Sequence, residues 1–263
     1  GETDAAYEGI FPLLQDGLTT TSWGTTLFLM ASTYDADMHA NPNNPKATNG
    51  TDQAWGGNRA RPDLVKKFFP NGNIPNLESY ATAEAAGDDR ALFNGVNRSL
   101  DNDDVATFKS GFGVAKFTNF KTDGSAGHDA TFPDADFFLM RAAEAYLNFA
   151  EADARINGGQ TTDEGTAAIN AIRKRANAST REDKGYSLSD ICDEWSREFY
   201  FEGRRRMDLI RFGKFGGDSD YTWEWKGGSQ DGGTIEASRN VYGIPTKECV
   251  ANSNIKQNPG YGD

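Results

Sequence analysis

The stretch "DFFLMRAAEAYLNFAEADARI", residues 136–156, decides the fold class of this chain of 263 residues. Its apolar side chains recur at helical spacing, with Leu139, Ala143 and Leu147 on one face. Six alanines between residues 142 and 154 make a thin helix that a neighbouring helix can approach closely. The stretch therefore predicts a long helix that begins near residue 136 and packs against another helix.

The next residues predict the partner of this helix. "NGGQTTDEG" (157–165) has the composition of a turn, with Thr162 or Asp163 placed to cap a following helix. "GTAAINAIRKRANA" (165–178) then repeats the alanine-rich pattern. Two such helices joined by a short turn resemble an antiparallel hairpin of the tetratricopeptide type.

A third helix is predicted from Ser187 to about Arg211. Ser187 and Asp190 form an acidic relative of the capping box at its start. The helix carries an apolar stripe of Ile191, Trp195 and Phe199.

The end of this helix, "EFYFEGRRRMDLIRFGKF" (198–215), places three arginines among aromatic residues. Glu194, Glu198 and Glu202 recur every four residues on the same helix. We therefore expect Arg204–Arg206 to form a partly buried ion-pair network with acidic neighbours, Glu144 and Glu151 included, while their stems lie on aromatic rings. An anion site is the alternative, but no glycine-rich cradle or second basic cluster supports it.

The regions on either side of the helices are richer in loops. Residues 1–135 contain short apolar runs such as "TTLFLMAST" (25–33), which predict strands or buried extended segments. A short helix is expected over Arg61–Phe69, with Pro62 in its first turn. Residues 212–263 predict an extended tail that packs on the helices. The whole is a mainly α fold with extensive loops, in three regions: 1–135, 136–211 and 212–263.

Composition excludes several classes of function. Lys+Arg number 27 and Asp+Glu 39, for a net charge of -12, which argues against a nucleic-acid partner. Cys192 and Cys249 lack metal-ligand spacing, so zinc is not predicted, and a disulfide between them stays open. No apolar segment is long enough to cross a membrane. The chain begins without Met or a signal peptide, so these were removed or the chain is a piece of something longer.

Four motifs in one order carry a resemblance to a known family. They are "RAAEAYLNFAEA" (141–152), "AINAIRKRA" (168–176), "EFYFEGRRRMDLIRFGKF" (198–215) and the ending "IPTKE…N…IKQNPGY" (244–261). Together they look like the C-terminal half of a SusD/RagB-family protein. "ARPDLVKKFFP" (60–70), "DDRALF" (88–93) and "GFGVAKFTNF" (111–120) agree with this resemblance, and "TTSWGTTLFLMA" (20–31) suggests the starch-binding branch.

The resemblance implies a SusD-like fold and a role in nutrient uptake. Members are lipid-anchored on the outer face of the outer membrane of Bacteroidetes-type bacteria, where they bind oligosaccharides, or occasionally peptides. They cap a SusC-type TonB-dependent transporter. Full members are longer, with further tetratricopeptide helices and a lipid-bearing cysteine in front, so we expect a separate N-terminal fragment to accompany this chain, or the numbering to begin mid-protein.

The residues favour a binding protein over an enzyme. His39 and His128 lie in no nucleophile or metal motif, and neither GxSxG nor Walker A occurs. Adjacent carboxylates such as Asp88 and Asp89 are typical of loops, so a glycoside hydrolase is not predicted. A subunit that only docks a partner, or one that binds a different glycan or a peptide, remains an alternative.

A glycan-binding site needs exposed aromatic rings, because the apolar faces of a sugar stack on them. Trp23 lies in "TTTSWGTT" (19–26), where small residues let a ligand approach the ring. We expect it to stack on an α-glucan such as a starch fragment, with Tyr7 as a second contact. The other four tryptophans are expected to pack in the core or to anchor loops, with the last two alternating as in a strand: Trp55, Trp195, Trp223 and Trp225.

The segment "FPDADFF" (132–138) suggests a calcium site. Asp134 and Asp136 stand two residues apart before the predicted helix, so their carboxylates can converge on one hard cation. The alternative is that they cap the helix. The family resemblance supports calcium, with the remaining ligands supplied by backbone oxygens or by a part of the protein outside this sequence.

Overall fold

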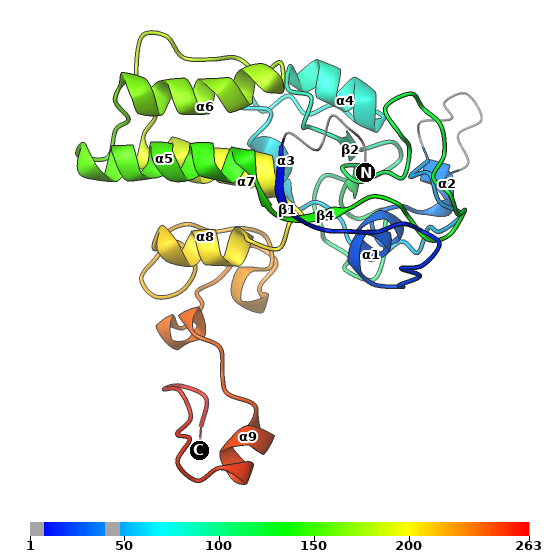
Figure 1. The fold of residues 1–263 in the computed structure, drawn as a ribbon. Coiled ribbons are helices and arrows are strands. Elements are labelled where there is room, and N and C mark those ends of the chain that lie inside the picture. Colours follow the sequence, from blue (N-terminus) through cyan, green and yellow to red (C-terminus); the bar gives the residue numbers. More distant parts are fainter. Residues whose placement is uncertain (1–7, 40–47, 263) are drawn as a thin grey trace. The chain divides into compact units, whose positions relative to one another are not determined.

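The computed structural model describes residues 8–39 and 48–262, and the chain forms two compact units, Gly1–Phe201 and Glu202–Asp263. The boundary lies inside the helical region predicted over residues 136–211. Most of the regular structure is helical, and the strands are few and short (Figure 1). The predicted mainly α fold with extensive loops is therefore confirmed.

The first unit contains seven helices and four strands within the described residues. The helices are α1 (Thr25–Ala31), α2 (Ala36–His39), α3 (Pro62–Lys66), α4 (Ser79–Ala86), α5 (Ala142–Ile156), α6 (Asp163–Arg175) and α7 (Leu188–Phe199). The strands are β1 (Gly9–Leu13), β2 (Phe93–Asn94), β3 (Gly113–Val114) and β4 (Phe137–Arg141). They form two antiparallel pairs, β1 with β4 and β2 with β3.

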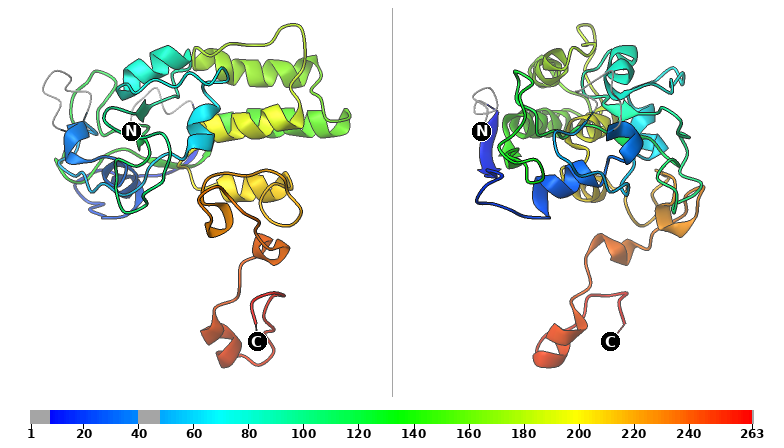
Figure 2. Two further views of the ribbon diagram at one scale, coloured as in Figure 1. Left: turned by 180° about the vertical axis from the view of Figure 1, so that it is seen from behind. Right: turned by 90° about the vertical axis from the view of Figure 1, so that its right-hand side faces the viewer.

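Helices α5, α6 and α7 form the predicted helical layer. The hairpin of α5 and α6 is joined by a short turn, and α7 packs on α5 (Figures 1 and 2). Alanines contribute much of the buried face of the hairpin, including Ala143, Ala150 and Ala168. Ser187 and Asp190 form the predicted capping box at the start of α7. The alanine pattern thus predicts the α5–α6 hairpin, and the cap predicts where α7 begins.

The first helix begins later than predicted, because residues 137–141 form β4. This strand pairs with β1, where Leu13 lies opposite Phe137. Hydrogen bonds between the two strands satisfy backbone N–H and C=O groups that would otherwise need partners within a helix. Leu139 is exposed instead of lying on the buried face of a helix. A helical pattern at residues 137–141 therefore does not exclude a strand there, because a partner strand far away in the sequence can pair with these residues.

The predicted third helix is in fact two helices. Helix α7 ends at Phe199, and Phe201 and Gly203 adopt left-handed backbone angles, with φ of 62° and 77°. Such angles interrupt a right-handed helix. Helix α8 then begins at Arg205 in the second unit. A continuous helix to Arg211 was therefore the wrong prediction.

The buried glutamates of α7 find partners that the sequence analysis did not assign. Glu194 pairs with Arg90, Arg173 and Arg197 at 2.7–2.8 Å. Glu198 pairs with three arginines, which are Arg90, Arg141 and Arg175. An ion-pair network therefore exists, but arginines from several elements build it around α7.

A hydrophobic core lies around the β2–β3 pair. Its buried members include Val65, Phe68, Phe93, Phe112 and Tyr200. Pro62 starts α3 as predicted. The run "TTLFLMAST", expected to be extended, instead forms α1 with Leu27 and Met30 buried. Short apolar runs do not distinguish a buried helix from a strand.

The second unit contains α8 (Arg205–Arg211), α9 (Thr246–Ala251) and two short 3-10 helices, Lys226–Gly228 and Ala237–Asn240. Trp223 stacks on Phe215 with ring centroids 6.1 Å apart. Trp225 has φ of 65°, so the strand predicted for this pair does not form.

The arginines of α8 do lie on aromatic rings as predicted, with Arg206 at 3.8 Å from the ring centre of Tyr242. Arg204, the residue before α8, pairs with Asp208 of that helix at 3.3 Å. Cys192 and Cys249 are both free thiols. Among the described residues, no helix combines the length and the apolar character needed to cross a membrane.

Candidate functional site

Three aromatic rings lie exposed together on the first unit. Trp23, Phe28 and Trp55 are 58%, 46% and 42% exposed. The ring centroids of Trp23 and Trp55 are 6.3 Å apart with planes tilted by 33°, and those of Phe28 and Trp55 are 6.4 Å apart. The edge contact of Phe132 with Trp23, at 5.2 Å, completes the group. We call these four residues the aromatic cluster.

Helix α1 positions much of the aromatic cluster. Trp23 precedes the N-cap residue Gly24, and Phe28 lies in the helix on its exposed side. The backbone N–H of Trp55 donates to the carbonyl of Ala31 at the other end, with an N···O distance of 2.8 Å. The helix therefore holds both indole rings, although they come from separate parts of the sequence.

The loop at Gly17 lies directly against the loop that carries Phe132, the residue whose ring contacts Trp23. Gly17 has φ of 64°, and a Cβ atom there would lie 2.5 Å from the carbonyl oxygen of Phe132. Only glycine therefore allows the two loops to meet in this way. Backbone N–H groups of Thr20 and Thr19 donate to the Asp16 carboxylate, and these hydrogen bonds close the turn and lower the pKa of that carboxyl.

A chain of polar side chains adjoins the rings. The indole Nε1 of Trp55 donates to Gln53 Oε1 at 2.9 Å, and Gln53 Nε2 donates to Asp52 Oδ1 at 2.8 Å. Thr131 Oγ1 donates to the same carboxylate at 3.0 Å. Amide and carboxylate groups beside open aromatic faces are what a sugar requires, because its ring faces are apolar and its edges carry hydroxyls.

The structure gives a different outcome for each aromatic residue considered as a sugar contact. Trp23 is exposed and open to a ligand. Tyr7 lies outside the described residues. Trp55 was expected to pack and is instead an open member of the aromatic cluster. The signal was present in the sequence, since Gly56 follows Trp55 as Gly24 follows Trp23.

The two candidate calcium ligands face one loop. Asp136 Oδ1 accepts a hydrogen bond from the backbone N–H of Gln15 at 2.8 Å. Asp134 Oδ1 lies 3.0 Å from the position that a Cβ on Gly17 would take. Neither residue caps a helix, because a strand follows them and α5 begins only at Ala142. The helix-capping alternative is therefore wrong.

The two carboxylate oxygens of Asp134 differ in their hydrogen bonding. His128 contacts Oδ2 through its backbone N–H and its ring Nδ1, both at 2.9 Å. Oδ1 is buried and has no hydrogen-bond partner among the described residues. Among all the residues that the structure describes, no three or more His, Cys, Asp or Glu side chains are grouped so that they could hold a metal ion. A cation here would therefore need backbone oxygens, such as the nearby Phe132 carbonyl, as further ligands.

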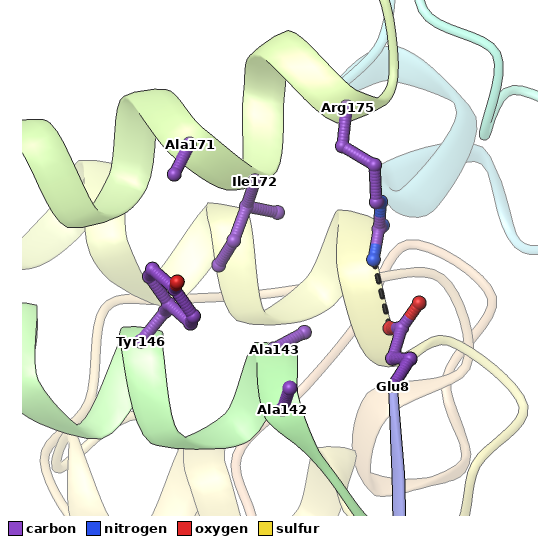
Figure 3. Close-up of a pocket in the computed structure, with 7 residues that line it drawn as sticks. All are labelled: Glu8, Ala142, Ala143, Tyr146, Ala171, Ile172 and Arg175. Atoms are coloured by element: carbon purple, nitrogen blue, oxygen red, sulfur yellow. Dashed lines mark hydrogen bonds and ion pairs between the residues drawn. The ribbon is translucent and has the colours of Figure 1, made fainter. Parts of the chain in front are cut away.

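A separate groove of about 340 Å³ runs between α5 and α6 (Figure 3). Alanines, Ile172 and Tyr146 line it, and an ion pair between Glu8 and Arg175, at 2.8 Å, lies at one end. Its small apolar side chains offer a sugar few hydroxyl partners. The aromatic cluster is therefore the better candidate site.

Comparison with known proteins places the chain in a family. The SusD family model matches residues 78–261. The chain is 37% identical over 289 residues to the starch-binding protein SusD of Bacteroides thetaiotaomicron, a match that covers 98% of this chain and 50% of that protein.

Solved structures share the fold. Surface glycan-binding protein A from Bacteroides uniformis has a TM-score of 0.58 at 19% identity, over 98% of this chain and 50% of that one. A laminarin-binding SusD-like protein has a TM-score of 0.58 at 22% identity, over 97% and 50%. The chain thus spans about half the length of the relatives it matches. Because the family model covers most of its residues, the chain belongs to the SusD family.

Proposed function

We propose that this chain is the ligand-binding part of a surface glycan-binding protein. It captures oligosaccharides, with α-glucans such as starch fragments as the preferred class, and passes them to a SusC-type TonB-dependent transporter in the outer membrane. The observation that carries this proposal is the open indole face of Trp23, 58% exposed, within a cluster of aromatic rings. Similarity over nearly the whole chain to a protein named for starch binding supports the ligand class.

The physical basis is stacking of a sugar on an indole ring. The C–H face of a pyranose leaves water when it covers the ring, and a buried aromatic contact of this kind contributes about 1–3 kcal/mol. The sugar hydroxyls find hydrogen-bond partners in side chains such as Gln53 and Asp52.

Family membership supports the cellular setting. We place the protein on the outward face of the outer membrane, anchored through lipid on a segment outside this sequence. Binding without catalysis is part of the proposal, because the curated relative is named as a binding protein.

Two other functions stay open to the same test. One structural relative binds laminarin, so a β-glucan is the main competing ligand, with peptides as a further class. A subunit that only assembles with the transporter would bind none of them.

The test is calorimetric titration of the 263-residue chain with maltoheptaose, laminarin oligosaccharides and a peptide mixture. The Trp23→Ala variant should bind maltoheptaose about tenfold more weakly or worse. Its melting temperature should stay nearly unchanged, because the ring is exposed; a core tryptophan would cost about 3–5 kcal/mol.

The matched control is Phe149→Ala, which removes a ring that is 52% exposed on α5, a different element. Its affinity should equal that of the wild type. Unchanged affinity in a folded Trp23→Ala protein would remove Trp23 from the site. Tighter binding of laminarin oligosaccharides or of peptide would make that class the proposed ligand in place of the α-glucan. Binding of none of the three would favour a subunit that only assembles with the transporter.

A further inference from the structure

Helix α5 carries apolar side chains on two of its faces. Leu147 and Ala150 lie on one face and are 0% exposed. Tyr146 and Phe149 lie on another face and are 47% and 52% exposed. A helix that is apolar on all sides is normally buried on all sides. The described residues therefore cover only part of the apolar surface of α5.

The open face of α5 continues into a groove along the α5–α6 hairpin. The hollow of about 340 Å³ in Figure 3 and a second one of about 440 Å³ share Tyr146 as a lining residue, so they adjoin each other. Six alanines line the two hollows: Ala142, Ala143, Ala145, Ala167, Ala168 and Ala171. We call the two hollows together the hairpin groove. Because alanine side chains are short, the groove has room for larger side chains from an occupant.

Charged side chains line the hairpin groove at only three positions, which are Glu8, Glu164 and Arg175. Arg175 is already paired, with Glu8 at 2.8 Å and with Glu198 at 2.7 Å. The other lining side chains are apolar apart from the hydroxyl of Tyr146. The occupant should therefore bury apolar side chains in the groove, because the groove offers little to an ion or to a sugar.

The shape of the hairpin groove suits a helix. Side chains of one helix pack into the grooves between the side chains of its neighbours, and stacked helical hairpins bury their faces against the next repeat. The relatives that match this chain are about twice as long, since the match covers 50% of the starch-binding protein SusD. About half of a full-length family member is thus available to supply such a helix.

The position of β1 brings a preceding segment close to the hairpin groove. Glu8 lines one end of the groove and directly precedes β1, which begins at Gly9 (Figure 3). Only residues 1–7 separate Glu8 from the start of this sequence. An extended chain spans at most about 3.6 Å per residue, so a segment that precedes this sequence joins it within about 25 Å of Glu8.

We propose that the hairpin groove binds an amphipathic helix from the part of the full-length protein that precedes this sequence. Its aliphatic or aromatic side chains lie between the alanines of α5 and α6 and cover Tyr146 and Phe149. This surface is separate from the aromatic cluster, and its role does not depend on which glycan the protein binds.

The first test compares two chains by hydroxyl-radical footprinting. One is the 263-residue chain, and the other is the long chain translated from the start codon of the same reading frame. Tyr146 and Phe149 should lose most of their reactivity in the long chain, because the helix covers them. Trp23 serves as the internal reference and should react equally in both chains. Equal reactivity of Tyr146 in the two chains would overturn the proposal, as would a reading frame that encodes no preceding segment.

The second test places a charge in the hairpin groove. Ala171 is exposed in the 263-residue chain, so Ala171→Arg should leave the melting temperature of that chain nearly unchanged. In the long chain the same substitution should lower the melting temperature by at least about 5 °C, because it buries an unpaired charge in an apolar contact. Ala167→Arg, at another exposed position of the groove, gives the same answer should the first variant fail to fold.

The matched control is Ala85→Arg, at an exposed position of α4 that does not line the groove. It should shift the melting temperatures of the two chains equally. Equal shifts for Ala171→Arg as well would contradict the covering helix.

Two other occupants are distinguished by the same footprint. If the 263-residue chain dimerises in sedimentation velocity and Tyr146 is protected only in that dimer, a second copy occupies the groove. Protection of Tyr146 only in a complex with the transporter would assign the groove to the transporter. Either result would replace the proposed helix.

Discussion

Asp134 has one carboxylate oxygen, Oδ1, that is buried without a hydrogen-bond partner among the described residues. Such an atom loses its contact with water and gains nothing in exchange, which costs free energy. The carbonyl of Phe132 and this oxygen both lie within 3.0 Å of the position that a Cβ on Gly17 would take. Both oxygens face the same space beside Gly17, and oxygen ligands suit a hard cation, so we propose calcium at Asp134 with Asp136 nearby.

Calcium should therefore raise the melting temperature of the chain above its value in chelator. A ligand at a hundredfold excess over its Kd adds about 2.7 kcal/mol of stability. The Asp134→Asn variant should lose most of this increment. Asp123→Asn is the matched control, because its exposed side chain keeps an oxygen for the Ser125 N–H. Identical wild-type melting curves in calcium and in chelator would refute the site.

At the scale of elements, α7 depends on two buried carboxylates. Burial alone would raise the pKa of Glu194, but Arg197, Arg90 and Arg173 together lower it from 4.5 to about 2. The pKa of Glu198 is also lowered, because Arg141, Arg175 and Arg90 outweigh its burial. These ion pairs connect α7 to α6, to the end of β4 and to the loop that carries Arg90.

The contribution of Glu194 to stability should be lost in acid. Because its pKa is lower in the folded state, the contribution is fully present above about pH 4.5 and disappears as pH falls towards 2. At neutral pH the Glu194→Gln variant should be about 3–5 kcal/mol less stable than the wild type, since it leaves buried arginines without a partner.

Urea unfolding at a series of pH values checks this prediction. The gap between wild type and Glu194→Gln should close as pH falls, because the protonated glutamate resembles glutamine. Glu182→Gln, at an exposed position, should show no gap at any pH. A gap for Glu194→Gln that stays constant from pH 7 to pH 3 would contradict the assignment.

At the scale of the whole molecule, the proposed partner is a SusC-type transporter that the protein covers as a lid. Family membership supports this partner. The protein should therefore co-purify with a TonB-dependent transporter from outer membranes in mild detergent. The Trp23→Ala variant should co-purify equally well, because Trp23 is assigned to the sugar. Recovery of the protein without any transporter would count against the lid.

The features that depend on neighbouring residues could be predicted without the structure. Alanine-rich helical spacing located α5 and α6, and Ser187 with Asp190 located the start of α7. The small residues around Trp23 identified an accessible ring. Each of these signals lies within one short continuous stretch of sequence, where the spacing and type of neighbouring residues are enough to predict the local structure.

The features that join distant segments could not be predicted from local patterns. Pairing with β1 turned residues 137–141 into a strand, and arginines from other elements became the partners of Glu194 and Glu198. Trp55 joined Trp23 because the far end of α1 binds its backbone. In each case the competing local preferences are weak, of the order of 1 kcal/mol or less per residue, and the contact that overrides them comes from residues far away in sequence.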